Sequence, residues 1–136
     1  SIFSSASEWI FSKGDDENGE GAIIQAKKSS LIVNGTGTLN LVSKGAEVTA
    51  LKVKNDLKIF SVTLNITTSD HGIKAGELLS VHSANINIVA KGDGMKTDVE
   101  AKSQEEAEEF TSNPYAGYIY IENSIVLFMK KLSFFR

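Results

Sequence analysis

Three aspartates near glycines have the residue type and spacing that most directly suggest chemistry. Asp70 stands two residues before Gly72, Asp93 directly precedes Gly94, and Asp98 follows shortly after. If the coils align, Asp70 and Asp93 stand one rung apart, at the strand spacing of about 4.8 Å, where two carboxylates repel each other unless a cation or a lysine lies between them. Ca²⁺ binds about six to eight oxygens, often from carboxylates and turn carbonyls, so the three aspartates predict a calcium site. In the alternative interpretation, each side chain only bonds to nearby backbone N–H groups of a tight turn.

A second set of charged residues recurs at a constant interval. Lys52, Lys74 and Lys96 are each 22 residues apart and each follows an apolar residue. If the chain stacks with this period, one ammonium group per turn could pair with the carboxylates of an acidic glycan. The alternative is neutralisation of the neighbouring aspartates, which contributes about 0–1 kcal/mol per exposed pair.

Uncharged polar residues alternate with apolar ones in three segments of the chain. The polar positions are Thr38, Asn40, Thr63, Asn65, Asn85 and Asn87. Stacking would align them into a flat Thr/Asn face, from which Thr63, Asn65 and Asn87 are predicted to bind a glycan. Such a face could also order water, as in ice-binding proteins, or be an ordinary solvated face. Asparagines in register also stabilise stacked strands by bonding to one another.

Two tyrosines complete the candidate binding residues. Tyr118 and Tyr120 alternate with Ile119 and Ile121, so both rings face outward if the isoleucines face the core. A ring pair on one face is a platform on which a pyranose could stack. The alternative is plain surface packing.

The elements that must position these residues come from a degenerate repeat. Leu51, Ile73 and Met95 are 22 residues apart, and short alternating stretches such as 57–59, 62–66, 79–81 and 84–88 are typical of strands. Turn residues lie between them, including Phe60-Ser61 and His82-Ser83. Strands this short bury a core only when successive coils of the chain stack on one another, so the repeat predicts a parallel β-helix. The alternative is an antiparallel sandwich.

The chain is expected to be one all-β domain spanning 1–136. It divides into an N-terminal cap or strand (1–20), regular coils (21–97), an acidic insertion (98–117) and a last coil with the C-terminal end (118–136). The insertion contains an S-x-x-E capping box at its centre and is expected to be a short helix or a mobile lobe. The segment 125–129 is apolar on both faces, so a partner or a second copy is expected to cover the open coil.

Composition narrows the function classes. The net charge is −3 and the single arginine is Arg136, which argues against nucleic acid as a ligand, because phosphate binding needs a basic patch. No cysteine is present, which excludes disulfides and thiolate metal sites. No apolar run approaches the ~20 residues that span a bilayer. The chain begins with Ser1, so a removed leader or a longer parent protein is expected.

Four motifs in order resemble one known family. They are the runs Leu31–Leu39, Lys54–Ile59, Asp70–Lys74 and Gly92–Lys96. The chain is similar, over about residues 20 to 125, to a bacterial family of carbohydrate-binding right-handed parallel β-helices, formerly a domain of unknown function and related in structure to polysaccharide lyases. The resemblance implies a secreted or cell-surface β-helix, here of about four to five coils, that binds plant-type or acidic polysaccharide with calcium.

These observations predict a carbohydrate-binding module that is not an enzyme. One alternative is a structural or adhesive solenoid that associates end to end. A second is a calcium-dependent lyase, in which Lys74 or Lys96 would have to act as the base. The third is an ice-binding face.

Overall fold

The computed structural model describes residues 8–13, 21–43, 47–97 and 117–130. Within these ranges the chain forms β-strands and no helix, so none of the described segments is a helix that could cross a membrane. The strands are β1 (Glu8–Lys13), β2 (Ala22–Ala26), β3 (Leu31–Asn34), β4 (Thr38–Ser43), β5 (Thr49–Val53), β6 (Asp56–Phe60), β7 (Thr63–Thr68), β8 (Ile73–Ala75), β9 (Leu78–His82), β10 (Asn85–Ala90), β11 (Met95–Thr97), β12 (Ile119–Glu122) and β13 (Ile125–Lys130).

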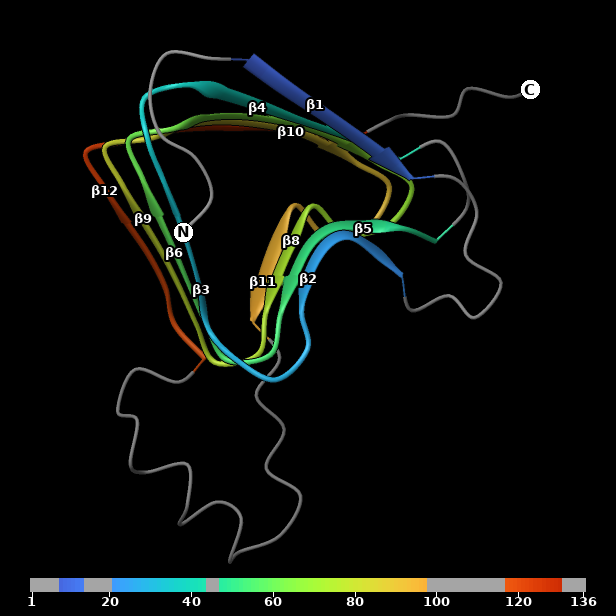
Figure 1. Ribbon diagram of the computed structural model, residues 1–136, viewed down its shortest axis with the longest axis horizontal. Coiled ribbons are helices and arrows are strands. Elements are labelled where there is room, and N and C mark those ends of the chain that lie inside the picture. Colours follow the sequence, from blue (N-terminus) through green and yellow to red (C-terminus); the bar gives the residue numbers. More distant parts are fainter. Residues whose placement is uncertain (1–7, 14–20, 44–46, 98–116, 131–136) are drawn as a thin grey trace, which may run out of the picture.

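The strands pair in parallel within three sheets. Sheet A has the order β1-β4-β7-β10-β13, sheet B β11-β8-β5-β2, and sheet C β12-β9-β6-β3. Each strand therefore pairs with the strand three places further along the chain. Figure 1 shows the sheets as three sides around a common interior, with the strands of each sheet stacked behind one another. The described strands make three separate ladders in a solenoid-like arrangement, and they do not form one closed solenoid.

The register of the ladders confirms the repeat read from the sequence. Leu51 pairs with Ile73 and Ile73 with Met95 in sheet B, at the predicted interval of 22. The same interval pairs Ile66 with Ile88 in sheet A. Every described strand pair is parallel, which excludes the antiparallel sandwich.

The core lies between the three sheets and is almost entirely aliphatic. Alternate residues of strands such as β6, β7 and β10 point inward, and the strands bury them turn upon turn. The largest fully buried side chains are Leu39, Leu41, Leu51, Leu57, Ile59, Leu64, Ile66, Ile73, Leu79, Ile86, Ile88 and Val33. Shared burial across the turns explains how strands of three to six residues are stable in this chain.

The corner between sheets C and A is a single left-handed residue. Ser61, Ser83 and Asn123 have φ values of 66°, 52° and 47°, and they occupy the same position in successive turns. The structure corrects the predicted turns here: Phe60 and His82 are the last residues of β6 and β9, and only the serines turn the chain.

The predicted insertion, apart from Gly117, lies outside the described residues, and so does the predicted helix within it. The last coil is present as β12 and β13, which extend sheets C and A.

Candidate functional site

A column of lysines lies on the outer face of sheet B. Lys52, Lys74 and Lys96 are Cα partners across β5, β8 and β11, as their spacing predicts. They alternate with core residues such as Leu51 and Ile73, so their side chains point away from the core. Neighbouring strands are about 4.8 Å apart, and like charges in direct opposition destabilise a sheet. The column therefore concentrates positive charge where an anionic ligand would relieve the repulsion.

The lysines have partners within the chain as well. Lys96 Nζ lies 3.9 Å from Asp93 Oδ2, and both side chains are partly exposed. Lys52 and Lys74 also have interaction partners. An exposed ion pair contributes only about 0–1 kcal/mol, so a ligand carboxylate can replace such a partner at small cost.

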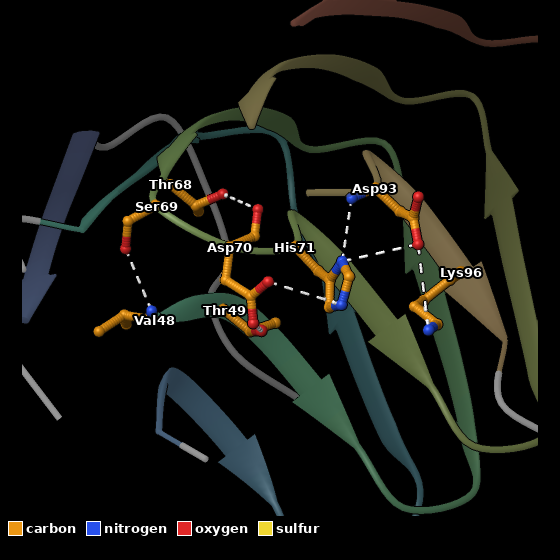
Figure 2. A network of polar contacts seen from close by, with 8 residues as sticks. All are labelled: Val48, Thr49, Thr68, Ser69, Asp70, His71, Asp93 and Lys96. Carbon is orange, nitrogen blue, oxygen red and sulfur yellow. Dashed lines mark hydrogen bonds and ion pairs between the residues drawn. The ribbon is translucent and has the colours of Figure 1, made fainter. Parts of the chain in front are cut away.

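The corner between sheets A and B brings Asp70, His71 and Asp93 together (Figure 2). His71 Nε2 lies 3.6 Å from Asp70 Oδ1, and His71 Nδ1 lies 3.7 Å from Asp93 Oδ2. The backbone N–H of Asp93 donates to His71 Nδ1 at 2.9 Å. A ring nitrogen that accepts this bond carries no hydrogen, which assigns the ring hydrogen of the neutral imidazole to Nε2, on the side of Asp70. The imidazole therefore separates the two carboxylates.

The repeat length explains this arrangement. His71 and Asp93 are 22 residues apart and occupy equivalent positions, whereas Asp70 is in line with Gly92, whose N–H donates to the Asp70 carbonyl at 2.9 Å. The prediction that Asp70 and Asp93 stand one rung apart is therefore wrong by one residue. A Cβ at Gly92 would lie 2.7 Å from His71 Nδ1, so the glycine leaves room for the ring.

Hydroxyl groups fix the backbone of this corner. Ser69 Oγ accepts the N–H of Val48 at 3.1 Å, and Thr68 Oγ1 donates to the Asp70 carbonyl at 3.1 Å (Figure 2). The hydroxyl of Thr49 lies 3.5 Å from Asp70 Oδ2. The corner is thus held by hydrogen bonds between neighbouring turns.

The described corner residues do not by themselves fit a calcium ion. Calcium needs about six to eight oxygens, but a ring nitrogen lies between Asp70 and Asp93, and Lys96 approaches the second carboxylate. No group of three or more His, Cys, Asp or Glu within the described ranges could hold a metal ion. Asp98, the third predicted ligand, lies outside those ranges, so calcium stays a prediction.

An asparagine ladder runs across the outer face of sheet A. Asn65 Nδ2 donates to Asn40 Oδ1 at 3.0 Å, and Asn87 Nδ2 donates to Asn65 Oδ1 at 3.0 Å. Thr63 lies beside this ladder, in register with Thr38 and Asn85. The structure thus brings together Thr63, Asn65 and Asn87. The amide bonds support the structural interpretation of the asparagines, because they join strands to one another.

An aromatic cluster on the outer face of sheet C joins the predicted Tyr120 to two rings that the sequence patterns did not indicate. The rings of Phe60 and His82 stack with centroids 4.9 Å apart and an interplanar angle of 13°. Tyr120 follows, with its centroid 5.7 Å from that of His82. Glu122 Oε2 lies 3.1 Å from His82 Nδ1. The sequence does carry a signal for Phe60 and His82, because the two residues are separated by the repeat length of 22.

The tyrosines belong to a coil whose apolar side chains are exposed. Tyr118 and Tyr120 are 59% and 52% exposed, and Tyr120 is in register with Ser80 on the outer face of sheet C. Ile119 and Ile121 align with the core residues Leu79 and Val81, yet they are more than 40% exposed. β12 has a described neighbour on one side only, which explains this exposure.

Comparison with known proteins links this arrangement to a family. The family model described as carbohydrate-binding domain-containing protein matches residues 5–126 of the 136. No curated protein and no solved structure matches the chain. The match includes the lysine column, the asparagine ladder and the aromatic cluster, and it extends over most of the sequence. The chain therefore belongs to the carbohydrate-binding domain-containing protein family.

Proposed function

We propose that this chain is an extracellular module, secreted or on the cell surface, that binds an acidic polysaccharide of plant type through the lysine column. The observation that carries the proposal is the direct register of Lys52, Lys74 and Lys96 on three neighbouring strands. The family match supports a carbohydrate as the ligand. The column supports an anionic one.

The geometry suggests how such a polymer would lie. A polyuronide carries one carboxylate per sugar, and its sugar units repeat on a length scale similar to the strand spacing of about 4.8 Å. A chain placed across β5, β8 and β11 would meet one ammonium group per strand. The affinity for such a polymer should fall strongly as the salt concentration rises, because the lysines are partly exposed to solvent and salt screens their attraction to the carboxylates.

We propose binding without cleavage. An eliminating lyase needs a base within hydrogen-bond reach of the proton that it removes, together with stabilisation of the resulting enolate. The family match is to a binding domain, which favours a non-catalytic role. Incubation with polygalacturonate should produce no new ultraviolet absorbance, and a rise in absorbance would favour the lyase.

The three sheets support a right-handed parallel β-helix as the fold behind this function. Each strand pairs with the third strand after it, and the core lies between the sheets. Right-handed crossovers dominate among parallel strands of one sheet, which supports that hand.

Calcium assistance is a separate proposal, supported by the resemblance and not by the described corner. Metal-stripped protein would be titrated calorimetrically with Ca²⁺, with and without polygalacturonate. Heat of calcium binding, followed by tighter glycan binding, would favour the calcium-assisted module. Equal glycan affinity in both cases would leave the lysines as the main anion contacts.

The central experiment compares two triple variants of equal charge. Lys52, Lys74 and Lys96 are replaced by glutamine in one, and the exposed Lys28, Lys58 and Lys91 in the other. Loss of polygalacturonate binding is expected in the first and near wild-type binding in the second. Equal losses in both would show that net charge, and not the column, is responsible.

A second candidate function is self-association, and a specific observation favours it. Among the residues whose burial the structure describes, nine large apolar residues are exposed, and eight of them lie between positions 118 and 129, on the last coil. A patch of this kind is typical of an interaction surface. Sedimentation velocity over a concentration series tests this, since a monomer at the highest concentration would contradict it.

A further inference from the structure

The outer face of sheet C has the composition of a sugar-binding surface. Phe60, His82 and Glu122 are in register on β6, β9 and β12. They alternate with the buried Ile59 and Val81, so they point away from the core. This face is a different side of the molecule from the lysine column on sheet B (Figure 1).

The three rings form one continuous strip, here called the aromatic strip: Phe60, His82 and Tyr120. Phe60 and His82 have centroids 4.9 Å apart, although ring atoms in contact are separated by only about 3.5–4.0 Å. The rings are therefore displaced sideways, as in other offset stacks, and part of a ring face stays uncovered. Tyr120 is tilted by 42° against His82 and is half exposed, which leaves its ring open to a ligand.

Polar groups border the strip. His82 Nδ1 and Glu122 Oε2 are 3.1 Å apart, which fixes the imidazole and leaves Nε2 with no partner within the described residues. The Glu122 side chain is 58% exposed. Lys58 is an exposed residue in register with Ser80, next to the strip. Hydrogen-bond donors and acceptors thus surround the apolar rings of the strip.

We propose that the aromatic strip is a subsite for an uncharged pyranose unit of a glycan. A pyranose has an apolar face of C–H groups and a rim of hydroxyls, which match exposed rings and bordering polar groups respectively. The Glu122 carboxylate makes the subsite unfavourable for a uronate, since two carboxylates at short distance repel each other. The aromatic strip thus selects uncharged sugars, whereas the lysine column selects negatively charged ones. This inference rests on the proposed function only in taking a carbohydrate as the ligand.

The test uses two probes on the intact chain: cellohexaose as the neutral glycan and a polygalacturonate oligomer as the anionic one. Calorimetry should show cellohexaose binding that Tyr120→Ala weakens about tenfold, because a stacking contact is lost. Tyr120→Phe keeps the ring and should bind nearly as the wild type does. Neither change should alter polygalacturonate affinity.

The lysine variants separate this inference from the proposed function. Replacement of Lys52, Lys74 and Lys96 by glutamine should leave cellohexaose affinity unchanged. If cellohexaose does not bind the wild type, or binds Tyr120→Ala equally well, the subsite is refuted, whatever happens to polygalacturonate. If polygalacturonate fails to bind while cellohexaose binding depends on Tyr120, the aromatic strip is supported and the lysine proposal falls. Circular dichroism of each variant verifies that the fold is unchanged.

Discussion

The backbone N–H of Asp93 donates a hydrogen bond to Nδ1 of His71, 22 residues earlier in the chain, at 2.9 Å. The bond joins two equivalent corners of neighbouring turns by a side chain instead of a backbone carbonyl. The same imidazole keeps Asp70 and Asp93 apart. One side chain thus both closes a backbone bond and separates two like charges.

Replacement of His71 by alanine should destabilise the protein by about 1 kcal/mol, since a hydrogen bond between turns is lost and the carboxylates lose their separating group. The fold should persist, because the corner is partly exposed and water can reach the freed N–H. Urea denaturation measures the change. His71→Asn, which still offers an acceptor oxygen, should recover part of the loss, and equal stability of all three proteins would contradict this role.

Asn65 is the central member of the asparagine ladder, with bonds to Asn40 and Asn87. Asn65→Ala should cost about 1–2 kcal/mol of unfolding free energy, because two hydrogen bonds disappear together. Asn85→Ala is the matched control: Asn85 is an exposed residue at the start of β10 and makes no ladder bond. Equal effects of the two changes on the urea midpoint would show that the ladder contributes nothing.

Gly72 and Gly94 are two corner glycines with different tolerance for a methyl group. A Cβ at Gly72 would lie 2.5 Å from the Gly94 carbonyl oxygen and 2.8 Å from Ile88 Cγ2, neither of which can move away easily. Gly72→Ala should therefore lower stability by about 1–3 kcal/mol. Gly94→Ala meets the ring of Phe128, which is 56% exposed and can turn aside, so a smaller loss in thermal unfolding is expected. The reverse order would contradict the steric explanation.

Ser61 occupies a left-handed conformation with φ of 66°, which residues other than glycine, asparagine and aspartate adopt at a cost in free energy. Asn123 already fills the equivalent position in the last turn with φ of 47°. Ser61→Asn should raise stability by about 0.5 kcal/mol, a shift measurable as a higher melting temperature. Ser61→Val, with a branched Cβ, should lower it, and a neutral result for both would argue against backbone strain at this corner.

The ladders were predictable from the sequence, because burial repeats at a fixed interval. The pairs Leu51 with Ile73 and Ile66 with Ile88 follow directly from the spacing of 22. The lysine column was predictable for the same reason. In each case an inward-facing residue fixes the register of the strand, and the outward-facing residue next to it is thereby aligned with its counterparts on the neighbouring strands.

The corner and the aromatic strip were not predictable in the same way. The sequence predicts Phe60 and His82 to be turn residues, because the alternation of apolar and polar residues ends at Ile59 and Val81. That alternation does not indicate whether the next residue still belongs to the strand and faces outward. Similarly, Asp70 and Asp93 look equivalent beside their glycines, yet they are one residue out of phase. Local motifs mark a turn, but only the ladder decides which side chains face each other.

The interval of 22 residues in the central turns has a consequence for how such a protein can change in length. Between Leu51 and Met95 equivalent residues recur every 22 positions, so this segment length is a unit of growth: its duplication keeps every inward residue inward. A slip of one residue within a strand would turn that strand inside out, whereas a corner can take up extra residues: Leu39 pairs with Leu64 at an interval of 25, and both stay buried. Each added unit of this kind would also bring one more lysine to the column, so the number of contacts with a long polymer would increase with the number of turns.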